Sequence, residues 1–310
     1  MATAATASTA SIRPLGFALG AEVTGVDLRS PLSPENRQAI HQAWLKHLVL
    51  IFPGQDLAAQ ELIAFSRHFG ELDRHDSTPH YRDPEHPEIL LVTNRPREGK
   101  PSETRNTGRN WHSDLTYTRH PAKGALLLSK KKPPVGGDTL FANLYLSYET
   151  LSPKYRSFIE GLEAIHDVTL VKGIEKRDPA KVADMKRINP PIAHPVVRVH
   201  PETGRKSLFV GQRVRGFVGM TEEESAPILA FLNDHAASYE FTYRHRWSVG
   251  DIVMWDNRCT QHLALPDFDQ TRIRHMIRCS LLGDASGHVL SAEGTAEDKE
   301  SLLQALAAVS

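Results

Sequence analysis

Hydrophobic residues recur along this chain mostly in short runs or in alternation with polar residues, and turn-forming Gly and Pro residues separate these runs. Alternation with a period of two predicts β-strands, because successive side chains of a strand point to opposite faces. The wider spacing of an amphipathic helix occurs in fewer places. The pattern predicts strands at 48–52, 88–93, 125–128, 139–141, 195–199, 206–210, 241–247, 251–255 and 271–282, and helices at 34–48, 56–69, 148–161 and 221–235.

Three of the predicted helices begin at residues that commonly cap helix N-termini. These caps are Ser33 followed by a proline, Asp56, and Thr221 followed by three glutamates. Many short strands separated by turns, with helices at the ends and flanks, favour a mainly β fold. The specific architecture we expect is a double-stranded β-helix, the jelly-roll barrel, which can bring residues about 150 positions apart to one mouth.

No shift in composition and no internal repeat divides the chain, so we expect a single domain over residues 12–290. Residues 1–11 are rich in Ala, Thr and Ser and are expected to be a disordered tail. Residues 291–310 are expected to form an amphipathic C-terminal helix or tail, with packing and oligomer contact both open. Residues 172–187 predict a charged, solvated insert, and the Pro-rich stretch 75–108 predicts a lid or binding surface.

Composition narrows the classes of partner. The chain has 37 basic and 37 acidic residues, a balance that favours neither nucleic acid nor an anionic membrane surface. No apolar run approaches the ~20 residues of a spanning helix. The first ten residues lack the basic and apolar regions of a signal peptide. With only Cys259 and Cys279, we expect a reducing, cytoplasmic compartment without disulfides.

The candidate chemistry centres on His112 and Asp114, read together with the distant His262. Two imidazoles and one carboxylate can occupy one face of a non-haem Fe(II) and leave positions open for a co-substrate and O2. On an extended segment, the side chains of residues two apart point to the same face, so His112 and Asp114 can bind the same metal ion. An H-x-D pattern by itself is also typical of a surface turn, and the sequence around it has to decide between the two.

Arg274 and Arg278 lie in the apolar segment that follows His262. If residues 271–282 form one strand, both arginines share a face, separated by roughly 13 Å at about 3.3 Å per residue. A guanidinium on an inner face requires an anion, and this spacing suits two different anionic ligands. The alternative is an edge strand on which both arginines are solvated.

These motifs together resemble the TauD/TfdA (taurine/2,4-D dioxygenase) family of Fe(II)- and 2-oxoglutarate-dependent dioxygenases. The resemblance runs from about Ile12 to about Asp284 and follows the family's order of motifs. The matching pieces are Trp111-His112-Ser113-Asp114, Gly136-Gly137-Asp138-Thr139, Trp255-Asp256-Asn257-Arg258, His262, Arg274 and Arg278.

The resemblance implies a set of cofactors and residue roles. His112, Asp114 and His262 would bind Fe(II), and Thr139 with Arg274 would hold 2-oxoglutarate, with O2 as the other co-substrate. Related halogenases have a small residue where this chain has Asp114, so a carboxylate there implies hydroxylation. Family members are often homo-dimers or homo-tetramers, which we expect here as well.

For the prime substrate, the resemblance implies that Arg278 contacts an anionic head, unless it supports 2-oxoglutarate from a second layer. His75 corresponds to a substrate-binding histidine of sulfonate-oxidising relatives, although a structural role is the alternative. His80 and Tyr81 are weaker candidates. Trp247 is expected to pack near the site, where it could also intercept stray oxidant.

One residue departs from the pattern of the taurine-specific relatives. Gly108 stands where they have Asn, which disfavours taurine itself and favours a different or bulkier anion. We therefore expect hydroxylation of an organosulfonate, alkyl sulfate ester or aryloxyalkanoate, with release of succinate and CO2 and breakdown of the product. The alternatives are a biosynthetic hydroxylase of the same family acting on an amino-acid-derived metabolite, and a non-catalytic cupin-like metal-binding or sensor protein.

Overall fold

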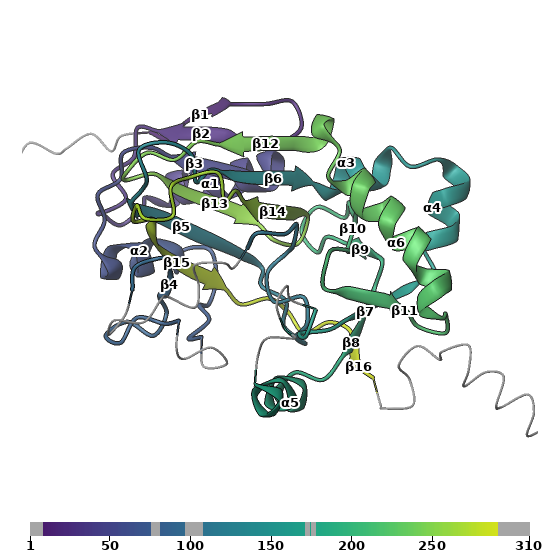
Figure 1. The fold of residues 1–310 in the computed structure, drawn as a ribbon. Coiled ribbons are helices and arrows are strands. Elements are labelled where there is room, and N and C mark those ends of the chain that lie inside the picture. Colours follow the sequence, from purple (N-terminus) through teal and green to yellow (C-terminus); the bar gives the residue numbers. More distant parts are fainter. Residues whose placement is uncertain (1–8, 76–80, 97–107, 171–173, 175–177, 291–310) are drawn as a thin grey trace, which may run out of the picture.

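The computed structural model describes residues 9–75, 81–96, 108–170, 174 and 178–290, and its largest element is a seven-stranded sheet (Figure 1). All neighbouring strands of this large sheet are antiparallel except β2 and β3. In spatial order its strands are β1 (Ser11–Pro14), β2 (Ala21–Thr24), β3 (Val49–Phe52), β13 (Ile252–Asp256), β5 (Gly124–Lys131), β15 (His275–Leu281) and β4 (Leu90–Thr93).

A three-stranded sheet packs against one face of the large sheet and carries part of the candidate site. Its central strand β6 pairs on both sides with antiparallel neighbours. Its order is β12 (Thr242–His245), β6 (Thr139–Asn143) and β14 (Thr260–Ala264). Two smaller sheets lie beside it: β11 (Val214–Phe217), β7 (Glu163–His166), β8 (Ile192–Pro195) and β16 (His288–Val289), and the hairpin β9 (Val197–Val199) with β10 (Lys206–Leu208).

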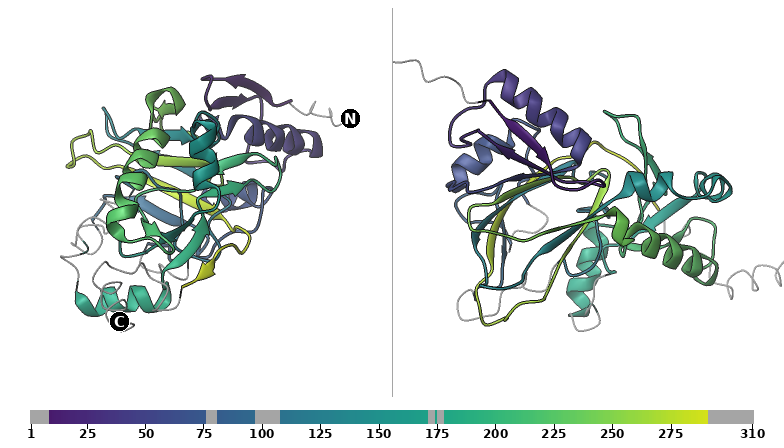
Figure 2. Two further views of the ribbon diagram at one scale, coloured as in Figure 1. Left: turned by 90° about the vertical axis from the view of Figure 1, so that its right-hand side faces the viewer. Right: turned by 90° about the horizontal axis from the view of Figure 1, so that it is seen from above.

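Six α-helices and one 3-10 helix flank the sheets in the described residues. Figure 2 shows α1 and α2 together over one side of the large sheet, with α4 and α6 at the opposite end of the molecule. The helices are α1 (Pro34–His47), α2 (Ala59–Ser66), α3 (Leu144–Glu149), α4 (Pro153–Ile159), α5 (Pro179–Ile188), α6 (Glu222–Ala236) and the 3-10 helix Tyr239–Phe241. The predicted mainly β class with flanking helices is confirmed. No helix among the described residues has the length and apolar character needed to cross a bilayer.

The alternating side chains of β3 show how the large sheet separates two layers of the core. Leu50 and Phe52 face the helical layer, where Phe52 meets Phe65 of α2 edge to face. Val49 and Ile51 point to the other side, into a layer shared with the three-stranded sheet. This second layer lies directly behind the candidate metal ligands, because the ring of Trp255 lies 4.8 Å from that of His262.

Several predicted boundaries shift for identifiable reasons. The helix predicted from Asp56 begins only at Ala59, with Ala58 as N-cap, so the capping role assigned to Asp56 is wrong. The helix predicted over 148–161 is two helices, because Ser152 caps a new helix that starts at Pro153. Ser33 and Thr221 cap their helices as predicted.

The termini and the charged insert are described only in part. Residues 178–188 of the insert include α5, which has no buried residue, in agreement with a solvated helical segment. Residues 291–310, predicted to be a C-terminal helix or tail, lie outside the described residues, as do residues 1–8 of the predicted tail.

Candidate metal centre and adjoining pockets

The three predicted metal ligands lie together. His112 forms an isolated antiparallel bridge with His262, in which each residue donates its backbone N–H to the carbonyl of the other, at 3.1 and 2.9 Å. Their ligand atoms and a carboxylate oxygen of Asp114 all lie within 4.8 Å of one another. Each histidine Nε2 is 3.9 Å from an Asp114 oxygen. Residues about 150 positions apart in sequence therefore converge on one point.

Burial and charge set the protonation states that a divalent cation requires. His112 Nδ1 lies 2.7 Å from the carbonyl oxygen of Asn110, which assigns the proton to Nδ1 and leaves Nε2 as a lone-pair donor. Burial lowers the pKa of His112, and it lowers the pKa of His262 to about 3. Both imidazoles are therefore neutral at neutral pH, as ligands must be.

Asp114 supplies the negative charge of this ligand set. Burial raises its pKa, but the charge of Arg278, joined at low pH by those of His262 and His112 once they are protonated, outweighs that effect and holds the pKa below its ordinary range. Its Oδ2 atom is buried and has no hydrogen-bond partner among the described residues. Such an orphaned anionic oxygen is costly unless a cation meets it. Two neutral imidazoles beside it fit Fe(II) or a similar divalent metal.

The residues predicted to hold 2-oxoglutarate also lie close together. Arg274 is 8% exposed, and its Nε donates to the carbonyl of Gly137 at 3.1 Å. No carboxylate of the described residues lies within 4.0 Å of its guanidinium, and burial lowers its pKa to about 10, with Asp138 opposing the shift. Thr139 is buried two residues after Gly137 and accepts a hydrogen bond from Trp247 at 3.0 Å. The arginine is thus a buried cation that meets no anionic side chain of the described residues.

Arg278 contacts the metal centre itself. Its Nη1 donates to Asp114 Oδ1 at 2.9 Å, and its buried Nε has no partner among the described residues. The two arginines are not held on one regular strand, because β15 begins at His275 and its register against β5 shifts between His275 and Met276. The prediction of a single strand over 271–282 is therefore wrong at its start.

His75 is buried in a left-handed backbone conformation, with φ of 54°. Its backbone N–H donates to Asp73 at 2.9 Å, and its Nδ1 lies 3.3 Å from the same carboxylate. Burial raises the pKa of Asp73, but the hydrogen bonds and charge of His75, together with the charge of Arg278, lower it overall. His75 Nε2 is buried without a partner among the described residues, and the pair lies near Arg278.

The remaining predicted residues are placed less directly. Trp247 is buried with Trp255 and Met276 in the layer behind the site, and its indole bonds Thr139. Tyr81 is half-buried, and its backbone carbonyl accepts a hydrogen bond from the Leu91 N–H. His80 lies outside the described residues.

Four residues near the site were given no role from the sequence: Asp73, Tyr117, Arg213 and Asn257, the last of which stands in a matching motif. Burial raises the pKa of Tyr117, and the charge of Arg213 opposes this rise. The guanidinium of Arg213 lies 5.2 Å from the Tyr117 ring centroid and donates to the Val168 carbonyl at 2.7 Å. Tyr117 follows Asp114 by three residues, a signal that could have identified it; Arg213 has no comparable signal.

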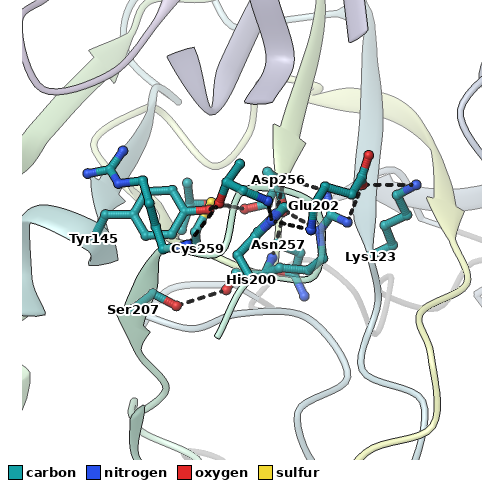
Figure 3. A network of polar contacts seen from close by, with 12 residues as sticks. Lys123, Tyr145, His200, Glu202, Ser207, Asp256, Asn257 and Cys259 are labelled. Atoms are coloured by element: carbon teal, nitrogen blue, oxygen red, sulfur yellow. Dashed lines mark hydrogen bonds and ion pairs between the residues drawn. The ribbon is translucent and has the colours of Figure 1, made fainter. Parts of the chain in front are cut away.

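A second group of potential ligands, His200, Asp256 and Cys259, lies in a polar network beside the site (Figure 3). Arg258 donates to both oxygens of Asp256, at 2.9 and 2.7 Å. The Nδ1 of His200 accepts two backbone N–H groups at 3.2 Å, so its proton is on Nε2, 3.1 Å from Asp256. These atoms already have partners, which makes the group a structural network rather than a second metal site.

Comparisons with known proteins agree with this geometry. The family model described as "Taurine catabolism dioxygenase TauD, TfdA family" matches residues 11–280. An (S)-phenoxypropionate/alpha-ketoglutarate-dioxygenase of Delftia acidovorans is 33% identical over 86% of this chain and 93% of its own. An alpha-ketoglutarate-dependent sulfate ester dioxygenase of Pseudomonas putida is 32% identical over 92% of this chain and 93% of its own.

Solved structures resemble the whole fold. The crystal structure of AAD-2 in complex with Mn(II) and N-oxalylglycine has a TM-score of 0.77 and 30% identity, and the match covers 90% of this chain and all of that one. N-oxalylglycine is an analogue of 2-oxoglutarate. The protein is therefore an oxidoreductase that uses Fe(II), 2-oxoglutarate and O2. The chain belongs to the TauD/TfdA family of alpha-ketoglutarate-dependent dioxygenases.

Proposed function

We propose that this enzyme hydroxylates a small anionic organic molecule at a metal centre formed by His112, Asp114 and His262. The observation that carries the proposal is the convergence of two neutral imidazoles and an ionised carboxylate whose Oδ2 has no partner among the described residues. With iron and 2-oxoglutarate bound, such a centre activates O2 to oxidise a C–H bond and releases succinate and CO2.

Arg274 and Thr139 are the proposed anchors of 2-oxoglutarate. A guanidinium in a buried site binds a carboxylate strongly, because few water molecules compete for it. The guanidinium of Arg274 has a lowered pKa, donates to the neutral carbonyl of Gly137 and has no carboxylate of the described residues within 4.0 Å, which is what such an anchor requires before the anion arrives. Trp247 fixes the Thr139 hydroxyl by donating to it, which leaves that hydroxyl's own proton for the ligand.

Arg278 and His75 are the proposed contacts of the substrate's anionic head. Arg278 uses Nη1 on Asp114, while its Nε has no partner among the described residues. The unpartnered Nε2 of His75 supports the same assignment, and the Asp73 carboxylate lies 3.3 Å from its other ring nitrogen, where it orients the ring. Because Arg278 touches the aspartate ligand directly, this placement holds the substrate next to the metal. Tyr81 is assigned only to the rim of the site.

The substrate class follows from chemistry and from the relatives' names. Those relatives include dioxygenases of (S)-phenoxypropionate and of sulfate esters, and an alkylsulfatase of Acinetobacter baylyi. Aryloxyalkanoates and sulfate esters carry one negative charge close to a carbon–oxygen bond, and a sulfonate, named for a relative in Schizosaccharomyces pombe, carries it on a carbon–sulfur bond. In each class the carbon to be oxidised is bonded to the atom that leaves. Hydroxylation of that carbon gives a hemiacetal-like product that breaks down to a carbonyl compound and the leaving group. We therefore assign an aryloxyalkanoate, an alkyl sulfate ester or an organosulfonate.

Three further assignments rest on the resemblance. We infer that the large and three-stranded sheets together make a double-stranded β-helix within a single catalytic domain spanning 12–290. A homo-dimer or homo-tetramer is the assembly we propose. A cytoplasmic location is supported by Cys259 and Cys279, which are both buried and free.

The test has two steps. Fe(II) and 2-oxoglutarate are added to the apo-protein without oxygen, and a weak visible charge-transfer band is expected when both bind. Succinate release is then screened over aryloxy acids, sulfate esters, sulfonates and amino acids. No band in iron-loaded protein would contradict the metal and co-substrate assignments. Release coupled only to an amino acid would favour a biosynthetic hydroxylase instead.

A further inference from the structure

The amide of Asn257 holds the backbone of the predicted ligand Asp114 on both sides. Its Oδ1 accepts the Asp114 N–H at 2.7 Å, and its Nδ2 donates to the Asp114 carbonyl at 3.0 Å. Nδ2 also donates to the carbonyl of Ala122 at 2.8 Å. The side chain is buried, so water cannot replace these three bonds if they are lost.

The backbone next to Asp114 has a conformation that needs such support. Leu115 is one of three non-glycine residues with positive φ among the described residues, at 55°. This left-handed conformation is unfavourable for a residue with a side chain, and it persists only where surrounding contacts enforce it. If the peptide on either side of Asp114 relaxed, the carboxylate would turn away from the two histidines.

Asn257 is itself held in a rigid turn. Its backbone N–H donates to the Lys123 carbonyl at 3.1 Å. The residues on either side, Asp256 and Arg258, form the buried ion pair of the polar network, which His200 and Glu202 extend (Figure 3). The amide therefore has little freedom to follow Asp114 if Asp114 moves.

We propose that Asn257 is a positioning residue for the metal centre: it fixes the Asp114 backbone so that the carboxylate faces His112 and His262. This inference rests on the proposed role of Asp114 as a metal ligand. Partners that orient a ligand typically change metal affinity by about 10- to 100-fold when they are removed. Asn257 touches the backbone of the ligand, so its effect acts through orientation and not through the charge of the carboxylate.

The experiment measures the dissociation constant of Mn(II) for the full-length apo-protein, by EPR of free Mn(II), together with the unfolding midpoint in urea. Asn257→Ala is expected to raise the dissociation constant about 10- to 100-fold. The matched control is Asn143→Ala, which removes another buried amide with three backbone bonds, to Ala18, Tyr145 and Leu146. The control should lower the unfolding midpoint but leave Mn(II) affinity unchanged.

The outcomes separate this inference from the metal assignment. If Asn257→Ala binds Mn(II) as tightly as the wild type, or if Asn143→Ala loses as much affinity, the positioning role is refuted. If the wild type itself does not bind Mn(II), or if His112→Ala binds it equally well, the metal assignment fails and this inference fails with it.

A second variant covers the case in which Asn257→Ala does not fold. Asn257→Asp keeps the size of the side chain and the acceptor for the Asp114 N–H. It places an oxygen against the carbonyls of Asp114 and Ala122 in place of the donor. We expect Mn(II) affinity to fall in this variant too, and wild-type affinity would overturn the proposal.

Discussion

Replacing Arg274 with methionine should stabilise the apo-protein while it weakens 2-oxoglutarate binding. Burial lowers the pKa of Arg274 from 12.5 to about 10, so the folded state holds this proton less tightly than the unfolded state. The charge therefore costs stability at every pH below about 10, and the cost fades only between pH 10 and 12.5. A difference of this size corresponds to about 3 kcal/mol at neutral pH.

The expected gain is smaller than that cost. Methionine has a similar length and no charge, but the variant also loses the hydrogen bond from Nε to the Gly137 carbonyl, worth about 1 kcal/mol. We therefore expect the free energy of unfolding of apo Arg274→Met to rise by about 2 kcal/mol. Urea unfolding of the metal-free, co-substrate-free protein measures it.

The Arg274→Met change should also weaken the binding of 2-oxoglutarate. A hydrogen bond to a charged group contributes about 1.5–3 kcal/mol, which is about 10- to 150-fold in a dissociation constant. The 2-oxoglutarate concentration for half-maximal succinate release should rise by that factor. The anaerobic visible band should need correspondingly more 2-oxoglutarate to reach half its amplitude.

Arg215→Met is the matched control, because Arg215 is exposed and paired with Glu222. An exposed ion pair contributes little to stability, so neither the free energy of unfolding nor the half-saturation for 2-oxoglutarate should change appreciably in this control. The reasoning about Arg274 would be refuted if its variant kept the wild-type half-saturation for 2-oxoglutarate. It would also be refuted if the apo variant were clearly less stable than the wild type.

Three further predictions follow from the geometry of the site. The neutral form of His262, with a pKa of about 3 against an ordinary 6.5, stabilises the fold above pH 6.5. Between pH 7 and pH 5 the free energy of unfolding of the apo-protein should therefore fall by about 2 kcal/mol because of His262. Urea unfolding of His262→Gln should not show this part of the decrease. Gly137→Ala should raise the 2-oxoglutarate concentration for half-maximal activity, because φ is +76° and a Cβ would lie 3.4 Å from Arg274 Nε. The same half-saturating concentration in variant and wild type would contradict this prediction. Arg278→Ala should raise the KM of the anionic substrate while sparing the anaerobic 2-oxoglutarate band, and equal loss of both ligands would refute separate anion sites.

Local patterns were sufficient to predict the elements that local chemistry determines. The run at β3 is apolar on both faces, and its two layers of contacts explain why. Thr221 and Ser33 are caps because their side chains reach backbone N–H groups three residues ahead. Asp56 also has a side-chain oxygen that could accept such a bond, but α2 starts only at Ala59, beyond the reach of Asp56 as a cap. The capping preference of a single residue does not determine where the helix begins.

The site was predictable where a motif named its residues and unpredictable where tertiary contacts assign the partners. The spacing of His112 and Asp114, with the resemblance, identified residues that the fold brings together with His262. The hydrogen bond between Arg278 and Asp114 joins positions 164 residues apart, and no pattern in either segment indicates it. The same holds for Arg213, whose relation to Tyr117 depends on how two loops meet.

The contacts around the candidate ligands indicate that their geometry is set by the chain before any metal arrives. Each residue from His112 to Asp114 is hydrogen-bonded to β14 or to the turn before it. His112 shares two backbone bonds with His262, Ser113 donates to the Thr260 carbonyl at 2.8 Å, and Asp114 is held by Asn257. Sites held this way lose little conformational entropy on binding, because the ligands are already ordered. Metal binding should therefore stabilise the protein through affinity alone, without the folding transition that accompanies metal binding where no preformed site exists.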